Sequence, residues 1–120
     1  MADRLVVKVT CGTDDPERAN QGFTVASAAI AAGASVSLWL TGDAAWFAVP
    51  GRASELSLPH ATPLADLLDA LLASGTVTLC TQCAARRSLT EQDIVPGIRL
   101  AGAAVFVEEA LTEGAQALVY

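Results

Sequence analysis

Short apolar segments alternate along this chain with longer helical segments, and this alternation restricts the fold more than any other feature of the sequence. The apolar segments are rich in Val and Leu and lack the polar alternation of a half-exposed strand; they are residues 5–10, 35–40, 76–80 and 115–120. Such strands are typical of a parallel sheet that helices cover on both faces. The sequence therefore predicts one α/β domain over residues 1–120, a three-layer α/β/α sandwich with a mostly parallel sheet.

Helix boundaries are marked by capping residues. Asp15 is a good N-cap, Pro16 suits the first helical position and Gly33 suits a C-terminal stop, so we expect a helix from Pro16 to about Ala32. Leucines at helical spacing predict a second helix between Pro63 and Gly75. The other expected segments are a short helical piece at 44–48, a loop at 50–63, one or two short helices within 83–93, a brief extended piece at 98–100 and a last helix at 101–113.

The chain carries little charge for its size. Charged residues make up 17% of the 120 residues and aromatic residues 5%, whereas apolar residues make up 52%. A small monomer with so little charge has difficulty covering its surface. We therefore expect a buried interface between copies of the chain, that is, a homo-oligomer.

The sign of the charge and the terminal sequence restrict partners and location. A net charge of −6 argues against nucleic acids and anionic membranes as partners, because both require a basic patch. The start of the chain does not resemble a signal peptide, and no apolar segment is long enough to span a bilayer. Three cysteines are an odd number and fit a reducing compartment better than a disulfide scaffold, so we expect a cytoplasmic protein.

Polar and sulfur-bearing residues follow three of the expected strands. Cys11 and Asp14 follow the first, Thr41 follows the second, and Cys80 and Cys83 follow the third. In open parallel sheets, ligands and chemistry lie beyond the carboxyl ends of the strands. We therefore expect these residues to share one rim of the sheet, with all three cysteines on the rim and none in the core.

The segment Cys80-Thr81-Gln82-Cys83 is the leading candidate for chemistry. It lies at the end of a buried strand and at an expected helix start near Cys83. Helix amides lower the pKa of a thiol at that position, and Arg86 and Arg87 follow one helical turn later. The pattern favours a stabilised thiolate, with the other cysteine available to resolve a mixed disulfide.

Other interpretations of the cysteines remain open. Cys80 could be a small buried hydrophobic residue at the end of its strand, whereas Cys83 lies in what reads as an exposed turn. A zinc site is less favoured, because the pair supplies two ligands and only Cys11 and His60 could complete it. Thioredoxin-type exchange usually involves a pair after an early strand, and here the pair follows the third. We therefore expect no metal and no cofactor.

Several polar residues have simpler explanations. The two arginines after the cysteine pair can form ordinary surface ion pairs with Glu91 or Asp93. The Gly12–Pro16 segment matches no phosphate loop and is better explained as a helix cap. A lone loop histidine such as His60 is more often structural than catalytic. Glu108-Glu109 reads as a solvated helix face or as part of a subunit contact.

Four segments together resemble the DsrE/DsrF-like family of small proteins, which includes sulfur-relay proteins. They are Gly12–Ala19, Gly33–Leu40, Pro63–Leu68 and the pattern Cys80-x-x-Cys83-x-x-x-Arg87, in this order and at this spacing. The resemblance covers nearly the whole chain. It implies a flavodoxin-like sandwich that assembles into trimers or hexamers, with a reactive cysteine in the loop after the third strand.

The resemblance also implies a function. In the sulfur-relay members that cysteine carries a persulfide between a donor and an acceptor protein, and both Cys80 and Cys83 match spacings found in the family. We therefore expect a persulfide carrier or thiol-exchange protein, with Arg86 and Arg87 stabilising the anion and Cys11, Asp14 and Thr41 nearby. The alternative is a non-catalytic oligomeric module that binds a small molecule or a partner, with incidental cysteines.

Overall fold

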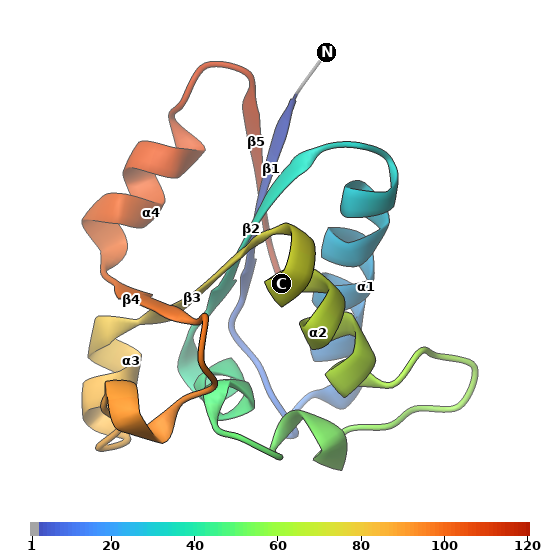
Figure 1. Cartoon of the computed structure of the whole chain (residues 1–120), viewed down its shortest axis with the longest axis vertical. Coiled ribbons are helices and arrows are strands. Elements are labelled where there is room, and N and C mark those ends of the chain that lie inside the picture. Colours follow the sequence, from blue (N-terminus) through green and yellow to red (C-terminus); the bar gives the residue numbers. More distant parts are fainter. Residues whose placement is uncertain (1–2) are drawn as a thin grey trace.

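A five-stranded parallel sheet forms the centre of the computed structural model, which describes residues 3–120 (Figure 1). The strands are β1 (Arg4–Val9), β2 (Ser35–Leu40), β3 (Thr76–Cys80), β4 (Arg99–Ala101) and β5 (Ala115–Val119). They lie in the order β4-β3-β2-β1-β5, and every pair is parallel. The predicted α/β fold with a parallel sheet is confirmed. The brief extended piece expected near residue 98 is a true edge strand, β4.

Helices connect the strands close to the expected positions. The α-helices are α1 (Pro16–Ala31), α2 (Leu64–Ser74), α3 (Thr81–Arg86) and α4 (Ala103–Ala110), and the 3-10 helices are η1 (Gly42–Ala48), η2 (Ala53–Glu55) and η3 (Glu91–Asp93). The side chain of Asp15 caps α1 by accepting from the Arg18 backbone N–H at 3.4 Å. The last helix is shorter than expected, because Ala101 pairs in β4 and Gly102 becomes the N-cap of α4. No helix within residues 3–120 is long and apolar enough to cross a membrane.

Helices α1 and α2 cover one face of the sheet and enclose the main core (Figure 1). Alternate residues of the central strands point into this core and are fully or almost fully buried; they are Val7, Val9, Val36, Leu38, Leu40, Val77 and Leu79. Phe23 of α1 packs edge-on against Phe47 of η1, with ring centroids 5.7 Å apart. This contact anchors η1 beside the carboxyl ends of β1 and β2, where the candidate site lies.

Helix α4 covers the opposite face and is held there by a buried carboxylate. Ser37 Oγ and Trp39 Nε1 donate to Glu109 Oε1 at 2.6 and 3.0 Å, and Arg99 pairs with Glu109 Oε2. Burial raises the pKa of Glu109, but the hydrogen bonds from Arg99, Ser37 and Trp39 outweigh it and leave that pKa below its ordinary value. The interpretation of Glu109 as part of a solvated helix face is wrong, because its side chain is buried against strands that sequence spacing does not connect to it, whereas Glu108 is exposed as expected. A subunit contact at these residues stays a prediction.

Candidate functional site

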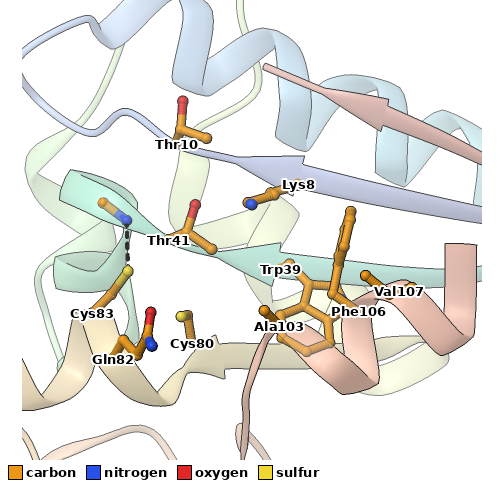
Figure 2. A pocket seen from close by; sticks show the side chains of 11 residues that line it. Lys8, Thr10, Trp39, Thr41, Cys80, Gln82, Cys83, Ala103, Phe106 and Val107 are labelled. Carbon is orange, nitrogen blue, oxygen red and sulfur yellow. Dashed lines mark hydrogen bonds between the residues drawn. The ribbon is translucent and has the colours of Figure 1, made fainter.

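A cavity of about 550 Å³ opens between α4 and the carboxyl ends of β1, β2 and β3 (Figure 2). It is formed by the ends of these strands, the start of the 3-10 helix η1, the first turn of α3 and the inner side of α4. Its walls combine two cysteines, one lysine and several apolar side chains. The lining residues are Lys8, Thr10, Trp39, Thr41, Gly42, Cys80, Gln82, Cys83, Ala103, Phe106 and Val107.

Cys80 occupies the junction between strand and helix. It is the last residue of β3 and the N-cap of α3, and its side chain is half-buried. The helix begins at Thr81, two residues earlier than the expected start near Cys83. Cys80, rather than Cys83, therefore precedes the first helical turn, where free backbone N–H groups can reach its sulfur.

The environment of Cys80 favours its thiolate. Partial burial raises the pKa of Cys80, but hydrogen bonds from the Cys83 backbone and thiol and from the Gln82 backbone, together with the charge of Lys8, lower it by more. The net pKa of Cys80 is below the ordinary thiol value. Both cysteines, like Cys11, are free rather than in disulfides.

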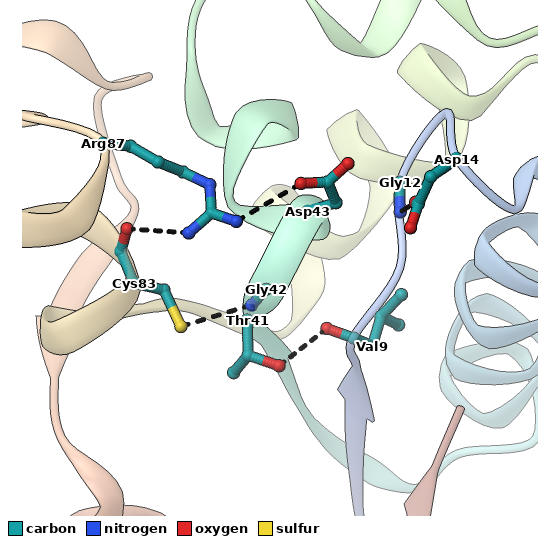
Figure 3. A network of polar contacts seen from close by, with 8 residues as sticks. All are labelled: Val9, Gly12, Asp14, Thr41, Gly42, Asp43, Cys83 and Arg87. Carbon is teal, nitrogen blue, oxygen red and sulfur yellow. Dashed lines mark hydrogen bonds and ion pairs between the residues drawn. The ribbon is translucent and has the colours of Figure 1, made fainter.

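Cys83 lies beneath η1 and is only 8% exposed. Its Sγ accepts a hydrogen bond from the Gly42 backbone N–H at 3.2 Å (Figure 3). Gly42 has φ +53°, and a Cβ there would lie 2.4 Å from the Thr10 carbonyl oxygen, so the close approach requires glycine. The expectation that Cys83 lies in an exposed turn is wrong, because the early start of α3 turns its side chain inward.

Arg87 joins α3 to η1 instead of facing a thiolate (Figure 3). Its Nη1 donates to the Cys83 carbonyl oxygen at 3.1 Å and its Nη2 contacts Asp43 Oδ1 at 3.3 Å. The guanidinium also lies 5.9 Å from the centre of the Trp46 ring. Pairing of Arg87 with Glu91 or Asp93 is therefore ruled out in this structure.

Arg86 and Asp93, which were part of the same expectation, do not form that ion pair either. Arg86 is exposed and does not line the cavity, and Asp93 accepts from Thr90 as part of the η3 cap. The cation that lowers the pKa of Cys80 is Lys8. The sequence did mark this residue, since Lys8 is the only lysine of the chain and the only charged residue in the four apolar segments expected to be strands.

Cys11 belongs to the core rather than to the cavity. It is 5% exposed, packs with the core residues beneath α1 and does not line the cavity. Burial raises the pKa of Cys11, and the nearby carboxylates of Asp15 and Asp14 raise it further. The prediction that no cysteine lies in the core is wrong for Cys11 and also for Cys83, because both side chains turn inward after their strands end.

The other expected rim residues have structural contacts. Asp14 is exposed, and its Oδ1 accepts from the Gly12 N–H at 2.7 Å, which shapes the turn after β1 (Figure 3). Thr41 lines the cavity, and its Oγ1 donates to the Val9 carbonyl oxygen at 3.1 Å. The structure thus brings Thr41 to the cysteine pair and leaves Asp14 outside the cavity.

Metal-binding geometry is absent from residues 3–120: no group of three or more His, Cys, Asp or Glu side chains is placed to hold an ion. His60 is exposed, has φ 61° and lines a separate cavity beside α1. Like Lys8, the lining residues Trp39, Phe106 and Val107 were not predicted from the sequence as part of a site. Trp39 and Phe106 pack edge-on at 5.5 Å, in a contact between β2 and α4 that local patterns do not reveal.

Comparison with known proteins finds relatives of low sequence identity. It is 28% identical over 106 residues to the uncharacterised protein MJ0760 of Methanocaldococcus jannaschii; the match covers 88% of this chain but 38% of that protein. The structure resembles that of the E. coli ychN protein, with a TM-score of 0.80 and 17% identity over the full length of both chains. It also resembles MTH1491 of Methanobacterium thermoautotrophicum, a protein of unknown function, with a TM-score of 0.67 and 12% identity over 98% of each chain.

The structural likenesses, at such low identity, establish the fold alone. The family comparison establishes more, because a model of the DsrE/DsrF-like family matches residues 3–120. The four segments that suggested this family from the sequence all lie within the matched range. The chain belongs to the DsrE/DsrF-like family.

Proposed function

We propose that this protein carries sulfur as a persulfide, or exchanges thiols, through Cys80. The observation that carries the proposal is the position of Cys80, a half-buried thiol with a lowered pKa at the wall of a cavity of about 550 Å³. Membership of the DsrE/DsrF-like family supports a small protein of the sulfur-relay type in general terms. A thiolate in a partly exposed, electropositive environment is the form in which cysteine acts as a nucleophile.

The two cysteines would then have different roles. Cys80 is more exposed than Cys83 and lies at the end of β3, so it can meet a donor. Cys83 accepts from the Gly42 N–H, and its own thiol donates toward Cys80. This chain of hydrogen bonds stabilises a negative charge on Cys80 and keeps Cys83 close enough to attack a mixed disulfide.

The transfer step needs no bound cofactor. The Cys80 thiolate attacks the outer sulfur of a donor persulfide, a new S–S bond forms on Cys80, and the S–S bond of the donor breaks. The donor leaves as a thiolate with the bonding electron pair, and the proton stays on the transferred sulfur. An acceptor thiolate can later take the outer sulfur from Cys80 in the same way, which returns the Cys80 thiolate.

Persulfide loading tests this proposal. Wild-type protein and the variants Cys80→Ser, Cys83→Ser and Cys11→Ser are incubated with a persulfide donor, and intact-mass spectrometry counts added sulfur atoms. We expect loss of loading in Cys80→Ser, partial loss in Cys83→Ser and normal loading in Cys11→Ser. Equal loading of all four proteins would overturn the proposal and favour the binding module with incidental cysteines.

A further inference from the structure

Lys8 is a positive charge in the cavity without an acidic partner. It lies on β1, lines the cavity with Cys80, and its Nζ is 5.0 Å from the centre of the Phe106 ring (Figure 2). Within residues 3–120, no salt bridge involves Lys8. By contrast, four arginines among these residues form salt bridges with carboxylates; they are Arg18, Arg52, Arg87 and Arg99.

An unpaired ammonium is unexpected at this position. Apart from Arg4 at its start, the other residues of β1 are apolar, β1 lies between β2 and β5 in the sheet, and the side chain of Lys8 is only partly exposed. Withdrawing a charge from water is costly unless an opposite charge or a hydrogen-bond partner is supplied. The Phe106 ring supplies a weak cation–π contact, and the Cys80 thiolate supplies one negative charge.

The remaining walls favour an organic molecule. Phe106 and Val107 of α4 present aromatic and aliphatic surface opposite the cysteine pair, and Trp39, which is 1% exposed, packs edge-on against Phe106 (Figure 2). A cavity of about 550 Å³ falls within the range of roughly 300–1,000 Å³ that is typical of small-ligand sites. An inorganic sulfur anion would leave this apolar surface without contacts, whereas a short carbon chain would cover it.

We propose that the cavity binds a small organic persulfide that carries a carboxylate, with Lys8 holding the carboxylate while Cys80 takes the outer sulfur. The inference rests on the sulfur-transfer function proposed above and adds the class of donor. The step is balanced: Cys80 thiolate and R–S–SH give Cys80–S–SH and R–S⁻, and the new thiolate and the carboxylate of the product both face Lys8. Lys8 is thus a specificity residue for the donor.

Two donors that differ at one carboxyl group test the inference: the persulfide of N-acetylcysteine, in which that group is a charged carboxylate, and the persulfide of its methyl ester, in which it is uncharged. The rate of Cys80 loading is measured for both at subsaturating concentration, in wild type and in Lys8→Met, Lys8→Arg and Arg52→Met. We expect wild type to prefer the carboxylate donor by about tenfold, as a charge-assisted hydrogen bond allows. The preference should disappear in Lys8→Met, persist in Lys8→Arg, and persist in Arg52→Met, which removes a cation outside the cavity.

Lys8 can act on loading in two ways, by stabilising the Cys80 thiolate and by binding the donor carboxylate. The ratio of the loading rates of the two donors separates these effects. A loss of thiolate in Lys8→Met would slow both donors equally, so only the ratio reports on carboxylate binding. A ratio near one in wild type, or an unchanged ratio in Lys8→Met, would overturn the inference. Loading from inorganic polysulfide serves as the reference: if Cys80 accepts sulfur from it but does not distinguish the organic donors, sulfur transfer stands and the donor class is wrong. If no donor loads Cys80, the proposed function itself fails.

Discussion

The three cysteines of this chain have three different environments. Hydrogen bonds and Lys8 lower the pKa of Cys80, whereas burial and two nearby carboxylates raise the pKa of Cys11. Cys83 is buried and accepts from a backbone N–H. Because only a thiolate attacks an alkylating reagent, these environments predict an order of reactivity.

Alkylation against pH measures that order. We expect Cys80 to react first near neutral pH, with a midpoint below the free-thiol value of about 8.5, and Cys11 to react last, with a midpoint above that value. Replacing Cys83 by Ala removes the thiol that donates to Cys80 and should move the Cys80 midpoint upward. Mass spectrometry of iodoacetamide-treated peptides gives each rate. An ordinary midpoint for Cys80 would contradict the predicted stabilisation of its thiolate.

Arg86 and Arg87 form a matched pair for testing the link between α3 and η1. Arg87→Ala removes the contacts to Asp43 and to the Cys83 carbonyl oxygen and should lower the free energy of unfolding by about 1–2 kcal/mol. Arg86→Ala removes an exposed side chain and should change it by less than about 0.5 kcal/mol. Urea unfolding followed by circular dichroism measures both. Equal effects of the two substitutions would contradict the assigned role of Arg87.

At the scale of secondary-structure elements, the attachment of α4 depends on Glu109. Replacing Glu109 by Gln keeps an acceptor for Ser37 and Trp39 but removes the charge that pairs with Arg99. We expect this change to lower the free energy of unfolding by about 2 kcal/mol, below the usual cost for a fully buried pair because Arg99 is 39% exposed. Glu108→Gln, next to it on the exposed side of α4, is the control and should have little effect.

The buried carboxylate of Glu109 also predicts a pH dependence of the free energy of unfolding. The folded-state pKa of Glu109 is lowered, so its contribution is fully present above the unfolded-state pKa of about 4.3 and is lost as the pH falls through the folded-state value. Urea titrations across this acid range should show a loss of stability in wild type that is smaller in Glu109→Gln. Identical acid profiles for the two proteins would contradict the prediction.

Local sequence signals predicted the secondary-structure elements better than they predicted the contacts between those elements. β3 ends at Cys80 as expected, because Gly75 and an apolar run define it, and α1 begins after the Asp15 cap. β4 is only three residues long, too short for a pattern, and gains its stability from pairing with β3. Cys83 is buried against η1, and Glu109 is buried against β2. Both contacts join residues that are far apart along the chain, so no local sequence pattern reveals them.

At the scale of the whole molecule, the coverage of the sheet is uneven. Helices α1 and α2 cover one face, but β5 at the edge has mostly exposed residues on both sides (Figure 1). Large apolar side chains are exposed on α4, at its C-cap and on β5; they are Val107, Leu111, Leu118 and Val119. The prediction of a parallel sheet covered on both faces therefore holds at the central strands and fails at β5. Exposed apolar surface of this kind, in a chain with 17% charged residues, favours contact with another protein surface.

We propose that a second copy of the chain covers the exposed apolar residues of α4 and β5, which would make the protein a homo-oligomer. Leu111 is the most exposed of them, at 79%, so Leu111→Glu should add charge to the interface without disturbing the core. Sedimentation velocity at micromolar concentration should show wild type as an oligomer and Leu111→Glu shifted toward monomer. The matched control is Ala31→Glu on the exposed end of α1, which should leave the oligomer intact. A monomeric wild type, or an oligomer unchanged by Leu111→Glu, would exclude this face.

Because Val107 lines the cavity and belongs to the exposed set, assembly through α4 should also alter access to Cys80.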